Sequence, residues 1–353
     1  MGRLGLLIVL ILLMIDKVKA GIIGLGRLGK SYAQLIQKNV KHVDLLAACS
    51  LSQEELAFAK TKLGVQYAYT DYHQIVNNHD IDAIFLLSPP QQHAMQIIDA
   101  VNAGKHVFTT TPLATNVEDC EAVIKAVRSR PSQVVMIGFE HRYDSAYMRA
   151  REIIKKGQIG DPVLVHSGTF DKEKNDSYYQ QHGANGGGIF LELNIKNIDI
   201  VRWLTGKEFS SVTSAGGAYK YDIFKKLNDA DNVMSLIELE GGGIANVSAS
   251  RISQDGFNTK TFVLGTEGSL EILDSSPSES IRIYNTQGIK TQVPQSYFER
   301  YELALLAQAN DFVSCIQHSQ KPMVNLEDGL EATRAAVAMT KSFLMKERIV
   351  IDR

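Results

Sequence analysis

A glycine-rich turn near residue 24 leaves this chain few possible folds. Residues 19–23 read as a short buried strand, the motif Gly24-x-Gly26-x-x-Gly29 follows, and a helical pattern begins near Tyr32. Gly24 allows a tight turn, Gly26 lets a ligand approach the backbone, and Gly29 lets the helix pack closely on its strand. A second buried strand follows at 43–49. The pattern therefore predicts the strand-helix-strand unit of a doubly wound parallel sheet.

The start of a helix behind such a turn is a typical binding site for a pyrophosphate. We therefore predict a dinucleotide site whose loop residues are Gly24, Gly26, Arg27, Leu28 and Gly29. A carboxylate at the end of the second strand normally binds the ribose 2′-hydroxyl, and its absence leaves room for a 2′-phosphate. Here that end reads Cys49-Ser50-Leu51-Ser52, with an arginine only in the glycine loop. Ser50 is therefore a predicted contact, and the choice between NAD and NADP stays open. A tight turn without a ligand is the alternative.

Strands and helices continue to alternate up to residue 138, which predicts a Rossmann domain over 17–138. Loops at the carboxyl ends of its strands form the ligand crevice in such folds. They add four predicted cofactor contacts: Ser88, Pro89, His93 and Thr110. Long alternating strands after residue 139 predict an α+β domain over 139–325 with a mostly antiparallel open sheet. A closing helix at 326–345, within the tail 326–353, is expected to pack back against the first domain.

The charge balance and the cysteines limit the possible partners and the cellular compartment of the protein. Lys and Arg number 37 against 39 Asp and Glu, so the charge does not favour nucleic acid. Three scattered cysteines offer no disulfide framework, which favours a cytoplasmic protein.

The apolar run from Leu4 to Ile15 would reach only about 18 Å as a helix, short of the roughly 30 Å hydrocarbon core of a membrane. We expect residues 1–16 to be a start-site artefact or disordered leader; a membrane-associated anchor and a packing segment are the alternatives.

Several motifs together resemble the glucose-fructose oxidoreductase and inositol dehydrogenase family, and look most like its myo-inositol 2-dehydrogenase branch. They are Gly24-Leu-Gly-Arg-Leu-Gly29, Ser88-Pro-Pro-x-x-His93, Ala103-Gly-Lys-His-Val-Phe108, Gly138-Phe-x-x-Arg142-Tyr-Asp, Gly186-Gly-Gly-Ile-Phe and Gly265-Thr-Glu-Gly268. The resemblance implies a Rossmann domain and a substrate domain whose open sheet forms homodimers or homotetramers. It also implies hydride transfer between nicotinamide and a carbon of a polyol or sugar.

The catalytic pattern of that family is substituted in this chain. The resemblance implies Glu-Lys-Pro after the Gly-Lys-His-Val strand, but Thr111 stands in place of the lysine. It also implies Asp-x-x-x-His on the helix after the triple glycine, where Glu192 and Lys196 stand instead. At 100° per residue, Glu192, Lys196 and Asp199 share one helix face, so we predict a catalytic set of these three and Thr111. An ordinary Glu192–Lys196 ion pair is the alternative.

The chemistry of this set favours an electrostatic role for Lys196. A lysine acts as a base only when its proton is easily lost, and the neighbouring carboxylates Glu192 and Asp199 oppose that loss. A charged Lys196 can instead polarise a carbonyl oxygen, and Thr111 can hydrogen-bond a sugar hydroxyl. No metal-binding motif is present, so none is predicted. The sequence thus predicts an NAD(P)-dependent oxidoreductase acting on a polyol, inositol or sugar derivative with altered or weak catalysis. A degenerate sensor or partner protein that binds dinucleotide or sugar is the alternative.

Overall fold

The structure is a computed structural model that describes residues 17–183, 186–272, 282–285, 288–291 and 293–352. The predicted leader, residues 1–16, lies outside these ranges. Within them, no helix is both long enough and apolar enough to cross a membrane.

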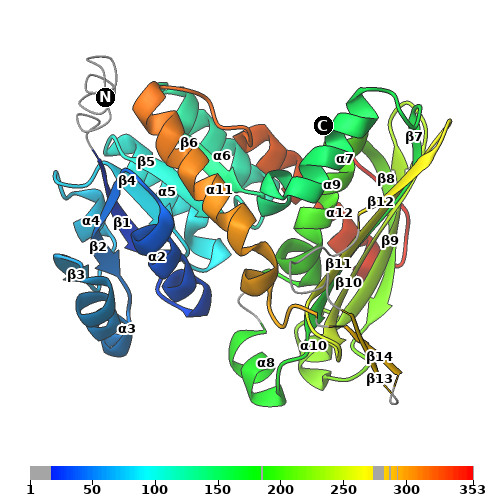
Figure 1. The fold of residues 1–353 in the computed structure, drawn as a ribbon, viewed down its shortest axis with the longest axis horizontal. Coiled ribbons are helices and arrows are strands. Elements are labelled where there is room, and N and C mark those ends of the chain that lie inside the picture. Colours follow the sequence, from blue (N-terminus) through cyan, green and yellow to red (C-terminus); the bar gives the residue numbers. More distant parts are fainter. Residues whose placement is uncertain (1–16, 184–185, 273–281, 286–287, 292, 353) are drawn as a thin grey trace.

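A six-stranded parallel sheet forms the first domain, as the alternating pattern predicts (Figure 1). Its order, β3-β2-β1-β4-β5-β6, places β1 at the centre, where the glycine loop leaves the sheet. The strands are β1 (Val18–Ile23), β2 (Val43–Cys49), β3 (Tyr67–Tyr69), β4 (Ala83–Leu86), β5 (His106–Thr110) and β6 (Val135–Gly138). Only the short β3 was not expected from the sequence, because three partly buried residues carry too little pattern.

Helices pack on both faces of this sheet. They are α2 (Arg27–Asn39), α3 (Gln53–Phe58) with the π-helical turn η1 (Ala59–Leu63), α4 (His73–Val76), the 3₁₀ turn η2 (Pro90–Gln92), α5 (His93–Asn102) and α6 (Val117–Arg128). The helix α2 buries Tyr32, Ala33, Leu35 and Ile36, which recur at helical spacing. This buried stripe packs α2 on the sheet, so the helix begins close to the carboxyl end of β1.

The second domain contains a mixed sheet in the order β12-β11-β7-β10-β9-β8-β15. All neighbours are antiparallel except β7 and β10, which confirms a mostly antiparallel sheet. Its strands are β7 (Pro162–Lys172), β8 (Phe209–Gly217), β9 (Asn232–Leu239), β10 (Ile244–Ser253), β11 (Asn258–Gly265), β12 (Ser269–Ile272) and β15 (Ile349–Val350). A separate small hairpin pairs β13 (Arg282–Asn285) with β14 (Gly288–Thr291).

The helices of the second domain lie mainly between its sheet and the first domain (Figure 1). They are the 3₁₀ turn η3 (Glu140–Tyr143), α7 (Ser145–Lys155), α8 (Asp176–His182), the π-helical turn η4 (Phe190–Asn194), α9 (Ile195–Thr205) and α10 (Asp222–Lys226). The outer face of the sheet carries no helix in this view. Helices therefore cover one face of the sheet and leave the other open.

Two long C-terminal helices join the domains. The helix α11 (Tyr297–His318) was not predicted, and it packs on the first sheet, where Phe312 lies edge-on to Phe85 with ring centroids 5.4 Å apart. Part of the segment assigned to the second domain therefore belongs to the core of the first. The helix α12 (Leu326–Met345) has the predicted bounds and contacts both α6 and α9.

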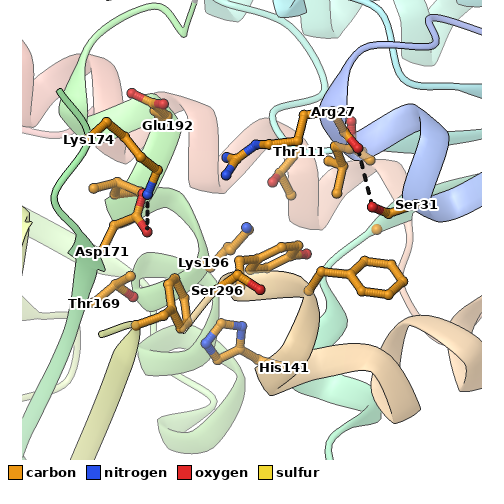
Figure 2. A pocket seen from close by; sticks show the side chains of 17 residues that line it. Arg27, Ser31, Thr111, His141, Thr169, Asp171, Lys174, Glu192, Lys196 and Ser296 are labelled. Atoms are coloured by element: carbon orange, nitrogen blue, oxygen red, sulfur yellow. Dashed lines mark hydrogen bonds and ion pairs between the residues drawn. The ribbon is translucent and has the colours of Figure 1, made fainter. Parts of the chain in front are cut away.

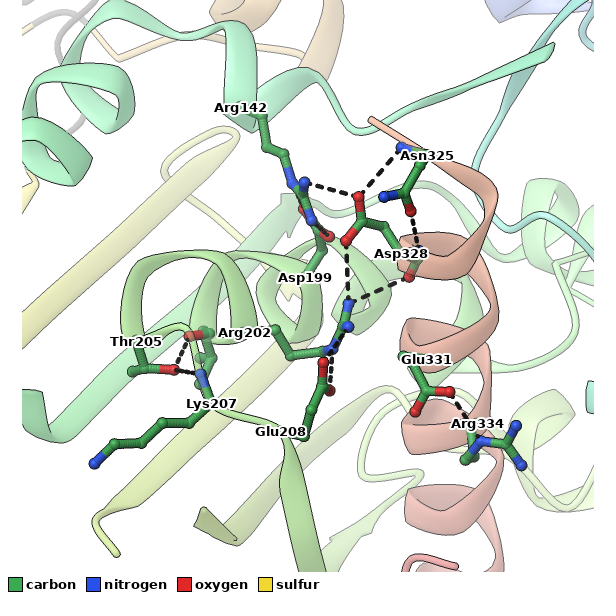
Figure 3. A network of polar contacts seen from close by, with 11 residues as sticks. Arg142, Asp199, Arg202, Thr205, Lys207, Glu208, Asn325, Asp328, Glu331 and Arg334 are labelled. Atoms are coloured by element: carbon green, nitrogen blue, oxygen red, sulfur yellow. Dashed lines mark hydrogen bonds and ion pairs between the residues drawn. The ribbon is translucent and has the colours of Figure 1, made fainter. Parts of the chain in front are cut away.

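A buried ion-pair network fixes the approach of η3, α9 and α12 (Figure 3). The Arg142 guanidinium donates to both carboxylate oxygens of Asp199, at 2.8 and 2.5 Å, and to Asp328 at 2.9 Å. Arg202 lies beside Asp328 and makes a two-point contact with Glu208. Bidentate arginine pairs hold a defined geometry, so this network fixes the orientation of α9 relative to the first domain.

Candidate functional site

The glycine loop has the geometry that the motif predicts. Gly24 has a φ of +92°, and a Cβ there would lie 2.5 Å from the Leu87 carbonyl oxygen. A Cβ on Gly29 would lie 2.0 Å from the Gly24 carbonyl oxygen, because the helix packs tightly on the turn. A Cβ on Gly26 would meet no atom within 4 Å. Gly24 and Gly29 are therefore required by the fold, whereas Gly26 leaves space beside the backbone.

The first turn of α2 fits a pyrophosphate. Gly26 is its N-cap and supplies no side-chain acceptor, and no acidic residue lies in the first turn. The backbone N–H groups at this end thus keep their positive potential for an external anion. Arg27 and Leu28, in this turn, line a cavity that is described below. These features fit the dinucleotide site that the sequence predicts.

The structure supplies a carboxylate at the end of β2 that the linear motif lacks. The Ser50 hydroxyl donates a 2.5 Å hydrogen bond to Glu55, which lies on α3, and the Lys30 ammonium lies 3.8 Å from the same carboxylate. Arg27 does not join this group: its guanidinium lies over the Tyr178 ring, 5.9 Å from the ring centroid. Glu55 could have been found from the sequence, since Ser52 caps the short helix that carries it.

His93 supports the crevice from behind and does not line the cavity. It is fully buried, with Nδ1 2.8 Å from the Pro112 carbonyl oxygen and Nε2 2.9 Å from that of Ser88. Burial lowers the pKa of His93, which keeps the ring neutral, so only one of these contacts is an N–H donor at a time. Ser88 is itself buried and donates to Gln96, while Pro89 is exposed. His93 and Ser88 therefore shape the loop at the carboxyl end of β4.

A cavity of about 300 Å³ lies between the two domains. Figure 2 shows Arg27 and Thr111 on the side of the first domain, with Glu192, Lys196 and Asp171 across from them. Six of the predicted site residues meet here: Arg27, Leu28, Thr110, Thr111, Glu192 and Lys196. A cavity of this size with several converging polar groups is typical of a small-molecule site.

Glu192 and Lys196 both face the cavity, but they do not form the ion pair that the spacing allows. Glu192 pairs with Arg251 at 2.5 Å, whereas the Lys196 ammonium lies 3.5 Å from Glu140. The turn that begins this helix, η4, is π-helical, so the assumption of 100° per residue does not hold around Glu192. The ion-pair alternative is therefore wrong, and Lys196 takes its carboxylate partner from another element.

Asp199 lies outside the cavity, contrary to the predicted polar face. It has no exposed surface, and Arg142 occupies both of its carboxylate oxygens. A carboxylate without exposed surface does not reach a substrate in the cavity. Asp199 therefore has a structural role in the network of Figure 3.

Sequence reasoning missed three residues around Lys196. Glu140 and His141 occupy unspecified positions of the Gly138-Phe-x-x-Arg142 motif, and Tyr297 lies in the first turn of the unpredicted helix α11. The Lys196 ammonium lies 3.9 Å from the centroid of the Tyr297 ring. A signal for that helix was present, because Ser296 caps it by accepting the Glu299 N–H three residues later. Nothing local marks Glu140 or His141.

A parallel sheet with an open glycine loop, joined by a polar cavity to a second sheet, is typical of dinucleotide-dependent oxidoreductases. Residues 18–139 match the model of an oxidoreductase family with an NAD-binding Rossmann fold, and residues 147–271 match the GFO/IDH/MocA C-terminal domain. The chain belongs to this GFO/IDH/MocA family of oxidoreductases.

Several relatives match over nearly their whole length. A scyllo-inositol dehydrogenase from Lactobacillus casei, solved with NAD(H) and scyllo-inositol, is 33% identical with a TM-score of 0.91, covering 95% of this chain and 99% of its own. The structure of a myo-inositol 2-dehydrogenase from Lactobacillus plantarum is 29% identical with a TM-score of 0.91, covering 96% and 100%. A scyllo-inositol 2-dehydrogenase (NAD(+)) from Bacillus subtilis is 27% identical, covering 93% and 94%.

Proposed function

We propose that this protein is an NAD-dependent dehydrogenase that interconverts a ring alcohol and a ring ketone of an inositol or a related polyol. The observation that carries this proposal is the placement of the Lys196 ammonium in the cavity that begins at the glycine loop. Relatives named for scyllo- and myo-inositol support the substrate class. Bound nicotinamide supplies the hydride acceptor or donor.

Lys196 is the group that we assign to the reacting oxygen. Its side chain is 17% exposed, so it reaches the cavity while most of its stem is buried. An ammonium in such a partly dehydrated site stabilises negative charge on an oxygen atom more strongly than it would in water. The Lys196 ammonium would thus stabilise the negative charge that develops on the reacting oxygen in either direction of the reaction.

The other polar groups of the cavity suit a ring with several hydroxyls. Asp171 and Lys174 form a 3.2 Å ion pair on the wall supplied by the second domain, and Glu192 is held by Arg251. Carboxylates accept hydrogen bonds from vicinal hydroxyls, while Thr111 both donates and accepts. Because Thr111 has no charge, the substituted site is expected to oxidise myo-inositol slowly. No described feature favours the sensor interpretation.

The test is a panel of inositol isomers and their ketones, followed by nicotinamide absorbance in both directions. We expect turnover with at least one member and a loss of about 100-fold or more in Lys196→Met. Calorimetric titration of NADH should show unchanged affinity in that variant, because Lys196 is assigned to the substrate oxygen and not to the pyrophosphate. Wild-type turnover that survives Lys196→Met would refute the role of Lys196, and absence of turnover across the panel would refute the substrate class.

We also propose that the open face of the seven-stranded sheet joins copies of this chain. Met234 and Leu236 on β9 are 56% and 52% exposed, and Ile244 on the adjacent β10 and Leu264 on β11 are also exposed. Apolar side chains gathered on an uncovered sheet face are typical of a subunit interface. Light scattering should find dimers or tetramers, and Met234→Glu with Leu236→Glu should yield monomers. A monomeric wild-type protein would overturn this proposal.

The three cysteines are free and buried. Buried free thiols suit a reducing compartment, and we propose the cytoplasm on this ground.

A further inference from the structure

A carboxylate that the proposed chemistry does not use lies directly behind Lys196. Glu140 is the first residue of η3, follows the end of β6, and has no exposed surface. Its Oε1 lies 3.5 Å from the Lys196 ammonium and 3.0 Å from His141 Nδ1. Its second oxygen, Oε2, makes no hydrogen bond to the described residues. A buried carboxylate with one orphan oxygen is costly, which calls for a reason beyond packing.

Glu140 remains charged in this setting. Burial by itself would raise the pKa of Glu140, but the Lys196 charge and the His141 hydrogen bond outweigh it and lower that pKa to about 2. Because a carboxylate only accepts, His141 Nδ1 carries the hydrogen of this contact, and Nε2 lies 2.7 Å from the Tyr301 hydroxyl oxygen. These two contacts fix the orientation of the His141 ring, and the negative charge of Glu140 faces Lys196.

The Lys196 head group is held on two sides. The Glu140 carboxylate lies on one side, and the face of the Tyr297 ring lies on another, 3.9 Å from Nζ. A lysine stem has four freely rotating carbons, so without fixed partners the ammonium would sample many positions. An ammonium attracted by both a carboxylate and an aromatic face is confined to one of these positions. The remaining directions face the cavity.

We propose that Glu140 is a positioning residue that holds the Lys196 ammonium, as a cation, toward the reacting oxygen. This inference rests on the proposed function of Lys196. The link passes through space between η3 and the start of α9, so neither residue implies the other in the sequence. Glu140 itself does not line the cavity.

A double-mutant cycle tests this link. Glu140→Gln keeps the shape of the side chain and removes the charge, and we expect kcat to fall about 10- to 100-fold with an unchanged Kd for NADH. The double variant Glu140→Gln with Lys196→Met should be no slower than Lys196→Met alone, because Glu140 acts only through Lys196. Glu140→Asp, which keeps the charge, should recover part of the rate. A loss of kcat in the double variant equal to the product of the two single losses would overturn the proposal.

The same cycle measured by thermal unfolding needs no turnover. The two single substitutions should lower the melting temperature by more in sum than the double substitution does, since each leaves the other charge without its partner. Asp311→Asn is the matched control: Asp311 accepts a 2.6 Å hydrogen bond from Tyr143, outside the cavity, and its substitution should add independently to Lys196→Met. Independent effects for Glu140 and Lys196 would refute the pairing. Coupled unfolding without any turnover would instead refute the proposed function alone.

Discussion

Gly26 offers a direct test of the dinucleotide site, because the fold and the ligand make opposite demands on this position. In Gly26→Val the new Cβ meets no atom within 4 Å, and the backbone φ of −59° suits any residue. The only loss to the fold is a favourable N-cap residue, which costs about 1 kcal/mol at most. For a chain of this size the melting temperature should fall by no more than about 3 °C.

Cofactor binding should suffer far more than the fold. The valine methyl groups would occupy the space that the first turn of α2 leaves for a pyrophosphate. Losing two hydrogen bonds to a charged oxygen, at about 1.5 to 3 kcal/mol each, weakens binding by roughly 10²- to 10⁴-fold. Calorimetric titration with NADH measures this change, and thermal unfolding without cofactor measures the cost to the fold.

Gly29→Ala is the contrasting control. Its methyl group would lie 2.0 Å from the Gly24 carbonyl oxygen, so the helix must move off the strand. This smaller substitution should therefore destabilise the protein more than Gly26→Val does. NADH affinity close to wild type in a folded Gly26→Val protein would refute our interpretation of the loop as a cofactor site.

Three further predictions follow from the cavity and its surroundings. The combined substitutions Thr111→Lys, Glu192→Asp and Lys196→His should raise the rate of myo-inositol oxidation about 10²- to 10⁴-fold. Each substitution alone should change that rate little, because such groups act as a unit. Steady-state kinetics in which the free-energy effects of the single substitutions add up to that of the combined variant would contradict this. Glu55→Gln should improve NADP(H) affinity relative to NAD(H) by roughly tenfold, because a 2′-phosphate would no longer face a carboxylate, and an unchanged ratio of the two Kd values would place the ribose elsewhere. The pKa of Glu140 is lowered to about 2 from an ordinary value of 4.5, so its share of the stability is present above about pH 4.5 and is lost as the pH falls toward 2. Urea unfolding of Glu140→Gln should accordingly vary less with pH across that range, and equal slopes for the two proteins would count against the pairing.

Local signals carried most of the fold prediction. The helix α12 has the bounds expected from its periodicity, and the alternation up to residue 138 yields the parallel sheet. The helix α11 was not predicted, because its start signal at Ser296 lies within a segment expected to belong to the second domain. Its apolar face is buried against the first sheet, which is far away in the sequence.

The sequence by itself determined the glycine loop, the order of strands and helices, and the residue types available for chemistry. These depend on backbone conformation and on periodic burial, which neighbouring residues dictate. Only the tertiary structure decided how the charges pair. Glu192 binds Arg251, Lys196 binds Glu140 and Asp199 binds Arg142, each across different elements. An ion pair depends on distances of a few ångströms between side chains, and a π-helical turn or a packed neighbour changes such distances without leaving a periodic mark in the sequence.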